Sequence, residues 1–595
     1  MNLSSLDWII IFSFFALFLI IGLGVSKKAG SSSKEFFLSG RNMPWWLLGI
    51  SMVATTFSAD TPNFVTDVVR QHGVAANWVW WAFLITGMLT VFIYAKLWRK
   101  SGALTDLEFY ESRYSGKEAS FLRGFRAIYL GVFFNVMIMA TVSLAAIKIG
   151  GVMFNLEPWK TVVYASVITV AYSSLGGLRG VILTDFLQFL VAMVGSIAAA
   201  IYIVNLPEVG GLTSLLERPE VASKLDIIPS ISDRELFITL LVIPIAVQWW
   251  SVWYPGAEPG GGGYIAQRML SAKNEKSAVS ATLLFNITHY ALRPWPWILI
   301  ALASLVLYPD MDALRSAFPH IAEDKVGHDL GYSAMLLTLP KGLLGIVIAS
   351  LIAAYMSTIS THLNWGSSYI TFDFYKRFVK PEASEKELVN VGRISTVILM
   401  VLAGLFSLAL QNAYAAFQIL LSIGAGTGSI FLLRWFWWRV NAFSEIAGMV
   451  VSFVLALLMS KDLQWGPEFL TSLGDDYKLL LSVGITTLSW VIVTFVTRPT
   501  DYATLAKFFN AIRPYGIGWN GFKNIAKGEN IKLEEGTGKF SVDLLAMFLG
   551  IIIVYSALFS VGMFIYGNTV NGLILLAISA GASFLLSRTW KKLSF

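Results

Sequence analysis

The chain has 595 residues, of which 56% are hydrophobic and only 14% are charged, and its mean hydropathy is +0.66. A soluble protein of this size carries about 25% charged residues and cannot hide so much apolar surface. The composition therefore excludes a soluble enzyme, a fibrous protein and a disordered chain, and it predicts an all-α polytopic membrane protein. The absence of cysteine excludes disulfides, thiolate metal sites and cysteine nucleophiles.

Segments long and apolar enough to cross a membrane recur along the whole chain, since a spanning helix needs about 20 mostly apolar residues. We predict fifteen of them, at 8–26, 44–72, 77–98, 125–148, 159–176, 181–205, 236–257, 277–308, 342–372, 388–410, 413–437, 439–460, 479–497, 542–566 and 571–587. The first segment is predicted to be a retained helix rather than a signal peptide, because Asp7 and no basic residue precedes it.

The charges of the connecting loops predict the orientation. Lys and Arg gather in loops 27–43, 99–124 and 498–541 and at the C-terminus, whereas acidic residues dominate 208–233 and 310–329. Basic loops face the cytoplasm, so we expect the N-terminus outside and the C-terminus in the cytoplasm. The same rule explains the net charge of +7 without a nucleic-acid partner.

No further catalytic or nucleotide-binding domain is expected. The longest gap, 498–541, is shorter than the usual lower limit of about 50 residues for a domain. The chain has no GxxxxGK[ST] loop and no H-E-x-x-H pair, and its five histidines are scattered over different segments. We therefore expect neither ATP hydrolysis nor an enzyme.

The segment 44–72 carries the sequence SADTP at its centre. Pro62 lacks the N–H that would bond to the carbonyl of Ser58, and it disfavours helix in the residue before it. We therefore predict that the helix unwinds near 57–61, which frees backbone carbonyls for a cation. A proline kink that binds nothing is the alternative, because kinks are common in membrane helices.

The segment 236–257 runs into the sequence WYPGAEPGGGG, in which two prolines and a run of glycines cannot continue a helix. A break flanked by aromatic residues at membrane depth suits a binding cavity. A flexible loop at the membrane surface is the alternative for the glycine run.

The segment 342–372 carries small and hydroxyl side chains on one helical face. Ala354, Ser357 and Thr358 stand at positions i, i+3 and i+4. Two hydroxyl oxygens and a nearby carbonyl could hold a small hard cation, which prefers oxygen ligands. Hydroxyls that bond back to their own helix are the alternative.

The two broken segments occupy corresponding places in the chain. Each is the first of a group of five segments, in 44–205 and in 206–437. Because five is odd, the second group enters the membrane upside down relative to the first, as in inverted-repeat transporters. We predict a five-plus-five inverted-repeat core, with an extra helix and loop at 1–43 and about four extra helices at 438–595.

Four stretches resemble the sodium:solute symporter family, which includes bacterial sodium/proline and sodium/galactose symporters and animal sodium/glucose cotransporters. They are 172–188, with its Gly-Gly and Thr-Asp-x-x-Gln pattern, 264–273, 357–376 and the unwound stretch of the second segment. The resemblance covers about residues 5–440. It is specific for the family and not for the solute.

The resemblance implies one sodium site, with sodium as a transported ion rather than a prosthetic group. Its ligands would be the carbonyls of Ala54, Phe57 and Ala354 and the hydroxyls of Ser357 and Thr358. Asp185 stands where the family has an aspartate on the inward exit route of sodium. A helix-start carboxylate satisfied by nearby amides is the alternative.

The solute-binding positions carry over less closely. Those that match the family's sugar contacts, together with two residues near the second break, are Asp60, Thr61, Trp80, Gln248, Trp253, His289 and Gln418. Trp80 stands where sugar members place a carboxylate, and His289 stands near where they place a lysine. Neither glucose nor proline is therefore implied.

Ionisable residues inside a membrane segment are costly and are functional by default. Asp60 can bind a cationic part of the solute, help to hold a cation, or titrate, and pairing with a basic residue such as Arg70 is the alternative. His289 is either a solute ligand or a helix-to-helix hydrogen-bonding residue. Aromatic belts at the interface explain most tryptophans, but Trp80 and Trp253 are predicted near the midplane.

The sequence thus predicts a sodium-coupled secondary active symporter that imports a small organic solute, a sugar, amino acid or organic acid, by alternating access. A membrane solute sensor or sodium-binding regulator without net transport is the alternative. The expected partners are the solute, sodium and the lipid bilayer, and no protein partner can be identified. Loop style and family predict a multi-pass protein of the bacterial inner membrane.

Overall fold

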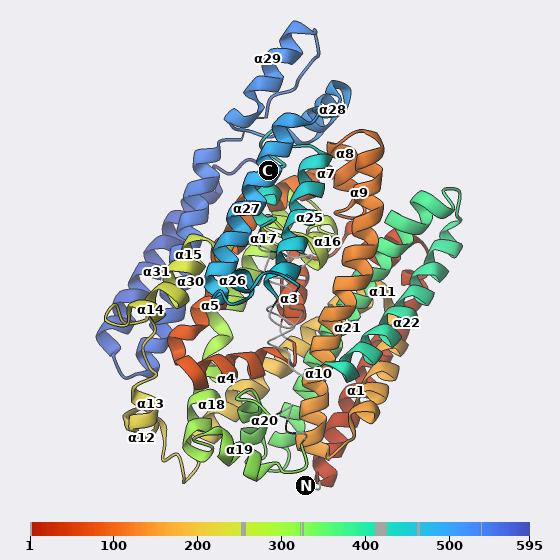
Figure 1. Ribbon diagram of the computed structural model, residues 1–595. Coiled ribbons are helices and arrows are strands. Elements are labelled where there is room, and N and C mark those ends of the chain that lie inside the picture. Colours follow the sequence, from red (N-terminus) through yellow and green to blue (C-terminus); the bar gives the residue numbers. More distant parts are fainter. Residues whose placement is uncertain are drawn as a thin grey trace.

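The computed structural model describes residues 3–56, 58–251, 258–321, 323, 326–410, 424, 426–460, 465–536 and 538–595. Within these ranges the regular structure is almost entirely helical, with one isolated bridge between Met43 and Ala272. Eleven of the described helical segments are long and apolar enough to cross a membrane. The long helices run side by side and form one elongated bundle (Figure 1).

Most of the described helices coincide with predicted segments, whereas much of the predicted segment 413–437 lies outside the described residues. The first is α1 (Ser5–Ala29), joined by α2 (Ser33–Leu38) and η1 (Ser39–Arg41) to the next group. That group contains α3 (Trp45–Thr56), α4 (Thr61–His72), η2 (Val74–Asn77), α5 (Trp78–Trp81), α6 (Phe83–Leu89), η3 (Thr90–Tyr94), α7 (Ala95–Ser101), α8 (Glu108–Arg113), α9 (Gly116–Ile128), η4 (Tyr129–Phe134), α10 (Asn135–Phe154) and α11 (Pro158–Val204).

The second predicted repeat contains shorter pieces at its start and long helices after them. It comprises α12 (Leu212–Glu217), α13 (Pro219–Ala222), α14 (Arg234–Phe237), η5 (Ile238–Val242), α15 (Ile243–Ala246), η6 (Gln248–Trp250), α16 (Gly263–Leu270), α17 (Glu275–Ile287), η7 (Thr288–Leu292), α18 (Pro294–Leu307), α19 (Met311–Ala317), α20 (Leu330–Leu336), α21 (Leu343–Ser368), η9 (Tyr369–Val379), α22 (Glu385–Ala409) and α24 (Gly428–Leu433).

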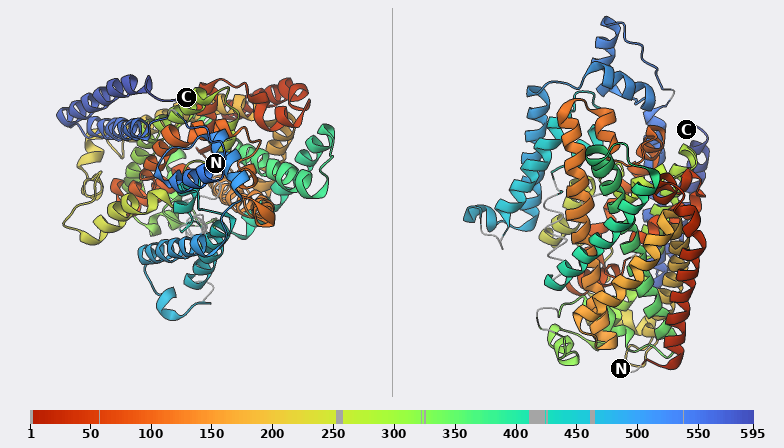
Figure 2. Two further views of the ribbon diagram at one scale, coloured as in Figure 1. Left: turned by 90° about the horizontal axis from the view of Figure 1, so that it is seen from above. Right: turned by 90° about the vertical axis from the view of Figure 1, so that its right-hand side faces the viewer.

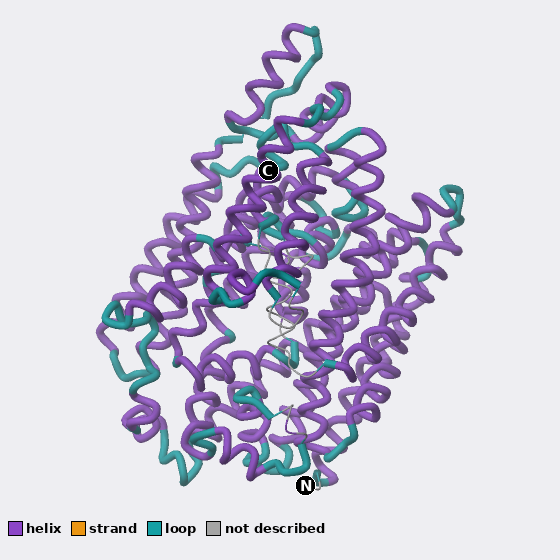
Figure 3. The backbone as a smooth tube through the Cα atoms, in the orientation of Figure 1, coloured by secondary structure: helices purple, strands orange, loops and turns teal. Residues whose placement is uncertain are grey.

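The remaining helices form the C-terminal part. They are α25 (Ala442–Met459), α26 (Glu468–Thr471), α27 (Asp475–Val496), α28 (Tyr502–Ile512), η10 (Ile517–Trp519), α29 (Asn520–Gly528), α30 (Phe540–Ile565) and α31 (Thr569–Trp590). Of these, α28 and α29 extend beyond the bundle at the end where the C-terminus lies, and the N-terminus lies at the other end (Figures 1 and 2). Most loops also lie toward these two ends (Figure 3).

The helix break predicted in the first repeat is confirmed. Helix α3 ends at Thr56 and α4 begins at Thr61, so the break lies between them and Pro62 stands in the first turn of α4. The second break begins earlier than the proline at 255 predicts. Helix α15 already ends at Ala246, the short 3-10 helix η6 spans Gln248–Trp250, and the α-helix α16 begins at Gly263.

Helix α11 consists of two predicted segments that meet at Gly177 (φ 51°, ψ −163°). Next to the start of α11, Phe154 packs against Trp8 near the start of α1, whereas Gly176 lies beside Gly22 and Val25 near the other end of α1. The first half of α11 therefore runs parallel to α1, and the chain turns back at Gly177. Only glycine adopts this backbone conformation without strain.

The helices differ in how deeply they lie in the bundle. In α21 and η9, 83% of the apolar span is buried, against 17% in α1 and 22% in α31. Helix α21 packs against α1, α3, α10, α11 and α22, so it lies at the centre. The exposed side chains of α1 are large and apolar, among them Ile9, Phe12, Ile20 and Leu23, as expected for a surface that faces lipid.

Several helices contain π-helical turns, which are rare and frequently mark functional sites. They are η3 and η4 in the first predicted repeat, and η5, η7 and η9 in the second. The second and third helices of each predicted repeat therefore both carry such a turn. These helices follow the broken one of each predicted repeat in the chain.

Candidate functional site

The break after α3 places the last turn of that helix against α21. The hydroxyl of Thr358 donates a hydrogen bond of 2.7 Å to the carbonyl of Thr55. Ser357 and Ala354 lie on the same face of α21, and all three side chains of that face are buried. The structure thus brings the predicted cation-binding residues of α3 and α21 together.

A helix that ends inside the bundle leaves its last four carbonyls without a partner in the helix. In α3 these are the carbonyls of residues 53–56. The guanidinium of Arg293 donates to the carbonyls of Val53 (3.1 Å) and Thr56 (3.4 Å). Neither the two bonds from Arg293 nor the bond from Thr358 of α21 goes to the carbonyl of Ala54. The oxygen of that carbonyl therefore suits a cation ligand.

The carboxylate of Asp185, in α11, contacts the hydroxyl of Ser357. One carboxylate oxygen accepts from Ser357 (2.6 Å) and the other from Ser51 (2.5 Å), and Arg268 Nη2 lies 3.8 Å away. The side chain is fully buried in the middle of the second half of α11 and bonds to hydroxyls rather than to helix-start amides. Because Ser357 donates its proton to Asp185, its lone pairs remain available to a cation.

Arg268 of α16 compensates the charge of Asp185 and joins three helices. Its guanidinium donates to Ser51 of α3 (3.2 Å) and to Thr361 of α21 (2.7 Å). Both members of the Arg268–Asp185 pair are fully buried. A buried carboxylate requires such a partner, so the cluster can remain charged inside the bundle.

The predicted solute residues of the third and eighth segments also lie together. The ring of Trp80 lies 5.6 Å from that of His289 and stacks 5.8 Å from that of Tyr290. Trp80 donates through Nε1 to Asn77 Oδ1 (2.8 Å). Gln248 approaches the same segment, and its amide donates to a backbone carbonyl there, that of residue 79 (2.7 Å).

Asp60 and Thr61 stand at the start of α4, on the far side of the first break. The carboxylate of Asp60 makes no capping hydrogen bond to α4, and Thr61 donates to the carbonyl of Thr56 (3.4 Å). Arg70 is bonded elsewhere, to Ser304 Oγ (2.9 Å) and the carbonyl of Tyr308 (2.7 Å), rather than in the alternative pairing with Asp60. Three predicted site residues lie outside the described residues: Phe57, Trp253 and Gln418.

Sequence reasoning missed three residues that complete this site. Arg293 bonds to His289 and to the end of α3, Tyr264 shares a hydrogen bond of 3.0 Å with Thr56, and Asn77 orients Trp80. A signal for Arg293 was present, since a charge inside an apolar segment is functional by default. Its partners on α3 lie about 240 positions away in the chain, which local patterns cannot reveal.

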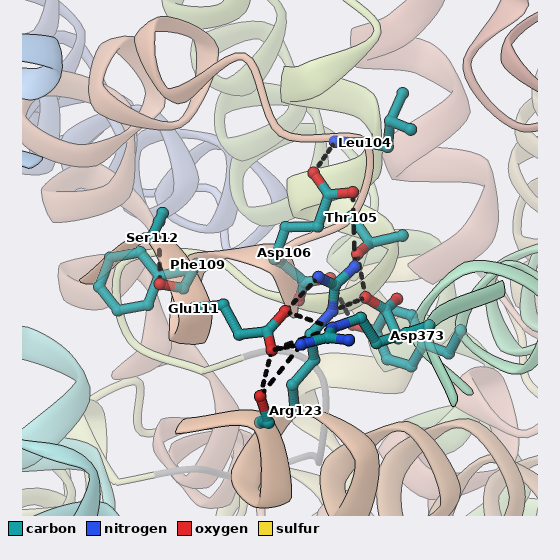
Figure 4. A network of polar contacts seen from close by, with 12 residues as sticks. Leu104, Thr105, Asp106, Phe109, Glu111, Ser112, Arg123 and Asp373 are labelled. Atoms are coloured by element: carbon teal, nitrogen blue, oxygen red, sulfur yellow. Dashed lines mark hydrogen bonds and ion pairs between the residues drawn. The ribbon is translucent and has the colours of Figure 1, made fainter. Parts of the chain in front are cut away.

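A second cluster of ion pairs and hydrogen bonds links α8 and α9 to η9 (Figure 4). Arg123 bonds to Asp373 (2.7 Å) and Glu111 (2.7 Å), and Thr105 also donates to Asp373 (2.9 Å). Burial alone would raise the pKa of Glu111, but hydrogen bonds from Arg377, Ser120 and Arg123 outweigh it and lower that pKa to about 2. Glu111 is therefore ionised throughout the physiological range.

Comparison with known proteins places this geometry in context. The model of the sodium:solute symporter family matches residues 36–452. The sodium/glucose cotransporter of Vibrio parahaemolyticus is 26% identical over 473 residues, which cover 77% of this chain and 86% of that protein. Sodium/glucose cotransporter 1 of Oryctolagus cuniculus is 26% identical over 577 residues, covering 90% of this chain and 83% of that protein.

A solved structure supports the fold. The substrate-bound, outward-open Na⁺-coupled sialic acid symporter superposes with a TM-score of 0.66, at 20% identity, over 84% of this chain and 100% of that one. At this identity the match concerns the fold alone. It is the helical transporter architecture that the sequence predicts.

Proposed function

Because the chain belongs to the sodium:solute symporter family, we propose that it imports a small organic solute together with sodium. Sodium moves down its gradient, and the solute is a sugar, an amino acid or an organic acid. The two broken helices and the helices packed around them then alternate between outward-open and inward-open arrangements. One charge that crosses 100 mV supplies about 2.3 kcal/mol for this work.

One observation carries this proposal: the pattern of hydrogen bonds at the free end of α3. Arg293 donates hydrogen bonds to the carbonyls of Val53 and Thr56. Thr358 donates one to the carbonyl of Thr55. The carbonyl of Ala54 belongs to the same last turn of α3, between those of Val53 and Thr55. A helix end arranged in this way offers oxygen ligands of the kind that small hard cations prefer.

The solute site is proposed on the other side of the same break. Asp60 and Thr61 at the start of α4 and the aromatic group of Trp80 and His289 would contact the solute. Gln248 would support the pocket through its bond to the backbone beside Trp80. We assign Asp185 to the path by which sodium leaves, because it accepts hydrogen bonds from the proposed ligand Ser357 and from Ser51, one turn before the free end of α3.

We further propose that the chain lies in a bacterial inner membrane with its N-terminus outside and its C-terminus in the cytoplasm. The described termini lie at opposite ends of the bundle (Figure 2). The basic loops, including 498–541, gather at the C-terminal end. The repeat boundaries 44–205 and 206–437 belong to this proposal as well.

Thermal unfolding of the purified protein tests the function directly. Each solute of a panel of sugars, amino acids and organic acids is added in sodium and, separately, in potassium. A transported solute is expected to raise the midpoint in sodium only, because ligands stabilise the folded state in proportion to their affinity. Uptake of that solute into proteoliposomes, measured with and without an inward sodium gradient, then separates a symporter from a sensor or regulator.

Two variants and one control locate the sodium site. Ser357→Ala and Thr358→Ala are expected to remove the stabilisation by sodium. Thr396→Ala serves as the control, because its equally buried hydroxyl bonds back to the carbonyl of Gly392 in its own helix. Equal losses in all three variants, or no effect of sodium on the parent protein, would contradict the proposed site.

A further inference from the structure

Arg293 lies between the two parts of the proposed site. It stands at the junction of the π-helical turn η7 and helix α18, and its side chain is fully buried. On one side it reaches the free end of α3, and on the other it reaches His289. It is therefore placed to contact both the helix that would hold sodium and the pocket that would hold the solute.

Toward α3, the guanidinium acts as a charged cap. It donates from Nη1 to the carbonyl of Val53 (3.1 Å) and from Nη2 to that of Thr56 (3.4 Å). A cation at the C-terminal end of a helix interacts favourably with the partial negative charge there. The two bonds enclose the position of Ala54, the proposed sodium ligand, from both sides along the chain.

Toward the pocket, the same nitrogen that bonds to Thr56 also bonds to His289 Nδ1. The ring of His289 packs edge-on against that of Trp80, 5.6 Å away. A guanidinium is planar, rigid and permanently charged. A change in the last turn of α3 must therefore alter the position of His289 and of the indole next to it.

Sodium would produce such a change for two reasons. A cation on the carbonyl of Ala54 competes with Arg293 for the negative end of α3, and the two positive charges repel each other. Both effects weaken the bonds from Arg293 to α3 and favour its bond to His289. The pocket around Trp80 thus differs between the sodium-bound and sodium-free states.

We propose that Arg293 is a positioning residue that transmits sodium binding at the end of α3 to the solute pocket at His289 and Trp80. This inference rests on the proposed function, since it requires the sodium site. It assigns a cause to sodium-dependent solute binding. Without Arg293, each site would still fill, but neither would respond to the other.

A cysteine placed beside the pocket can report this response, because the natural chain contains no cysteine. Val79→Cys is suitable, since residue 79 is partly exposed and neighbours Trp80 without contacting Arg293 in any described bond. The full-length protein in lipid nanodiscs is alkylated with a small maleimide in sodium and in choline. Equilibrium binding of radioactive sodium is measured on the same samples.

In the Val79→Cys protein, sodium is expected to change the alkylation rate by about fivefold, the lower end of usual coupling between sites. Arg293→Gln is expected to abolish this change while sodium still binds. Arg293→Lys keeps the positive charge but not the planar guanidinium with its several N–H donors. This variant should retain less than half of the change in alkylation rate. Arg70→Gln is the matched control, because Arg70 is also buried and bonded to α18 but makes no described bond to α3.

The outcomes are distinguishable. If sodium binds but leaves the alkylation rate unchanged, or if Arg293→Gln retains the full change, the inference is wrong although the proposed function stands. If the parent protein binds no sodium, the proposed function itself fails. Should Arg293→Gln not fold, Arg293→Lys decides: an undiminished sodium effect overturns the inference, and a reduced effect with intact Arg70→Gln supports it.

Discussion

At the scale of single residues, the hydroxyl of Ser357 links the uncharged oxygen ligands proposed for sodium to the buried carboxylate of Asp185. It donates to Asp185 and so presents its lone pairs to the proposed sodium ion. Asp185 is in turn held by Ser51 and lies close to Arg268. Groups that orient metal ligands in this way usually contribute strongly to affinity.

Asp185→Asn is therefore expected to weaken sodium binding about 10- to 100-fold. The amide cannot accept a hydrogen bond at both positions, so Ser357 loses its fixed orientation. A titration with radioactive sodium measures the effect. An unchanged dissociation constant would show that Asp185 does not support the site.

Glu111 gives a prediction about pH. Its pKa is lowered from 4.5 to about 2 in the folded protein, so its contribution to stability is complete above pH 4.5 and disappears as the pH falls toward 2. Glu111→Gln should lower the free energy of unfolding by about 1–2 kcal/mol at neutral pH, allowing for solvent screening. Unfolding curves of both proteins should converge below pH 4.5, and a constant difference would contradict this origin.

At the scale of single elements, sequence predicts the helices and one break well. The proline after a polar stretch predicts the break that follows α3. The two halves of α11 are predicted as separate segments. The early end of α15 is missed, because the helix stops where Gln248 turns to bond with residue 79, far away in the chain. The π-helical turns are missed as well, since no local sequence signal marks them.

The turn inside α11 provides a test with a neighbouring control. A Cβ on Gly177 would lie 2.7 Å from the carbonyl of Phe36, and the residue has φ +51°, whereas a Cβ on Gly176 would meet nothing closer than 3.6 Å. Gly177→Ala should lower the free energy of unfolding by about 2 kcal/mol or more, and Gly176→Ala by less than about 1 kcal/mol. Denaturant unfolding in detergent measures both, and equal effects would argue against the turn.

At the scale of the whole molecule, the C-terminal part is folded onto the core. Phe508 of α28 and Trp519 of η10 lie over the guanidinium of Arg113, at 5.4 and 5.2 Å. Lys96 of α7 forms a buried ion pair of 2.6 Å with Asp543 of α30. The sequence shows that the segment 498–541 is basic and too short for a domain, but it does not show where it docks.

The pair between α7 and α30 permits a double-variant test. Asp543→Leu alone should cost about 3–5 kcal/mol of unfolding free energy, because it leaves Lys96 buried without its partner. Replacing both, with Lys96→Met, should recover most of that loss. The free energies of unfolding of both single variants and of the double variant test this prediction. If the loss in the double variant equals the sum of the losses in the two single variants, the two charges act independently.

The predicted orientation can be read from labelling of single cysteines. Ser232→Cys and Glu529→Cys replace exposed residues in the acidic loop 208–233 and the basic loop 498–541, which the predicted orientation puts on opposite sides of the membrane. An impermeant maleimide should label the first in intact cells and the second only after lysis. The reverse pattern would place the N-terminus in the cytoplasm.

The π-helical turn η7 has a consequence for motion. Thr288–Leu292 lies immediately before Arg293 and includes His289. If the wide turn moves along the helix by one residue, the residue that it passes rotates by about 100° around the helix axis, since an α-helix has 3.6 residues per turn. Such a register shift would carry Arg293 away from the carbonyls of α3 without breaking α18, and would leave the end of α3 free for sodium while it changes the solute pocket at His289.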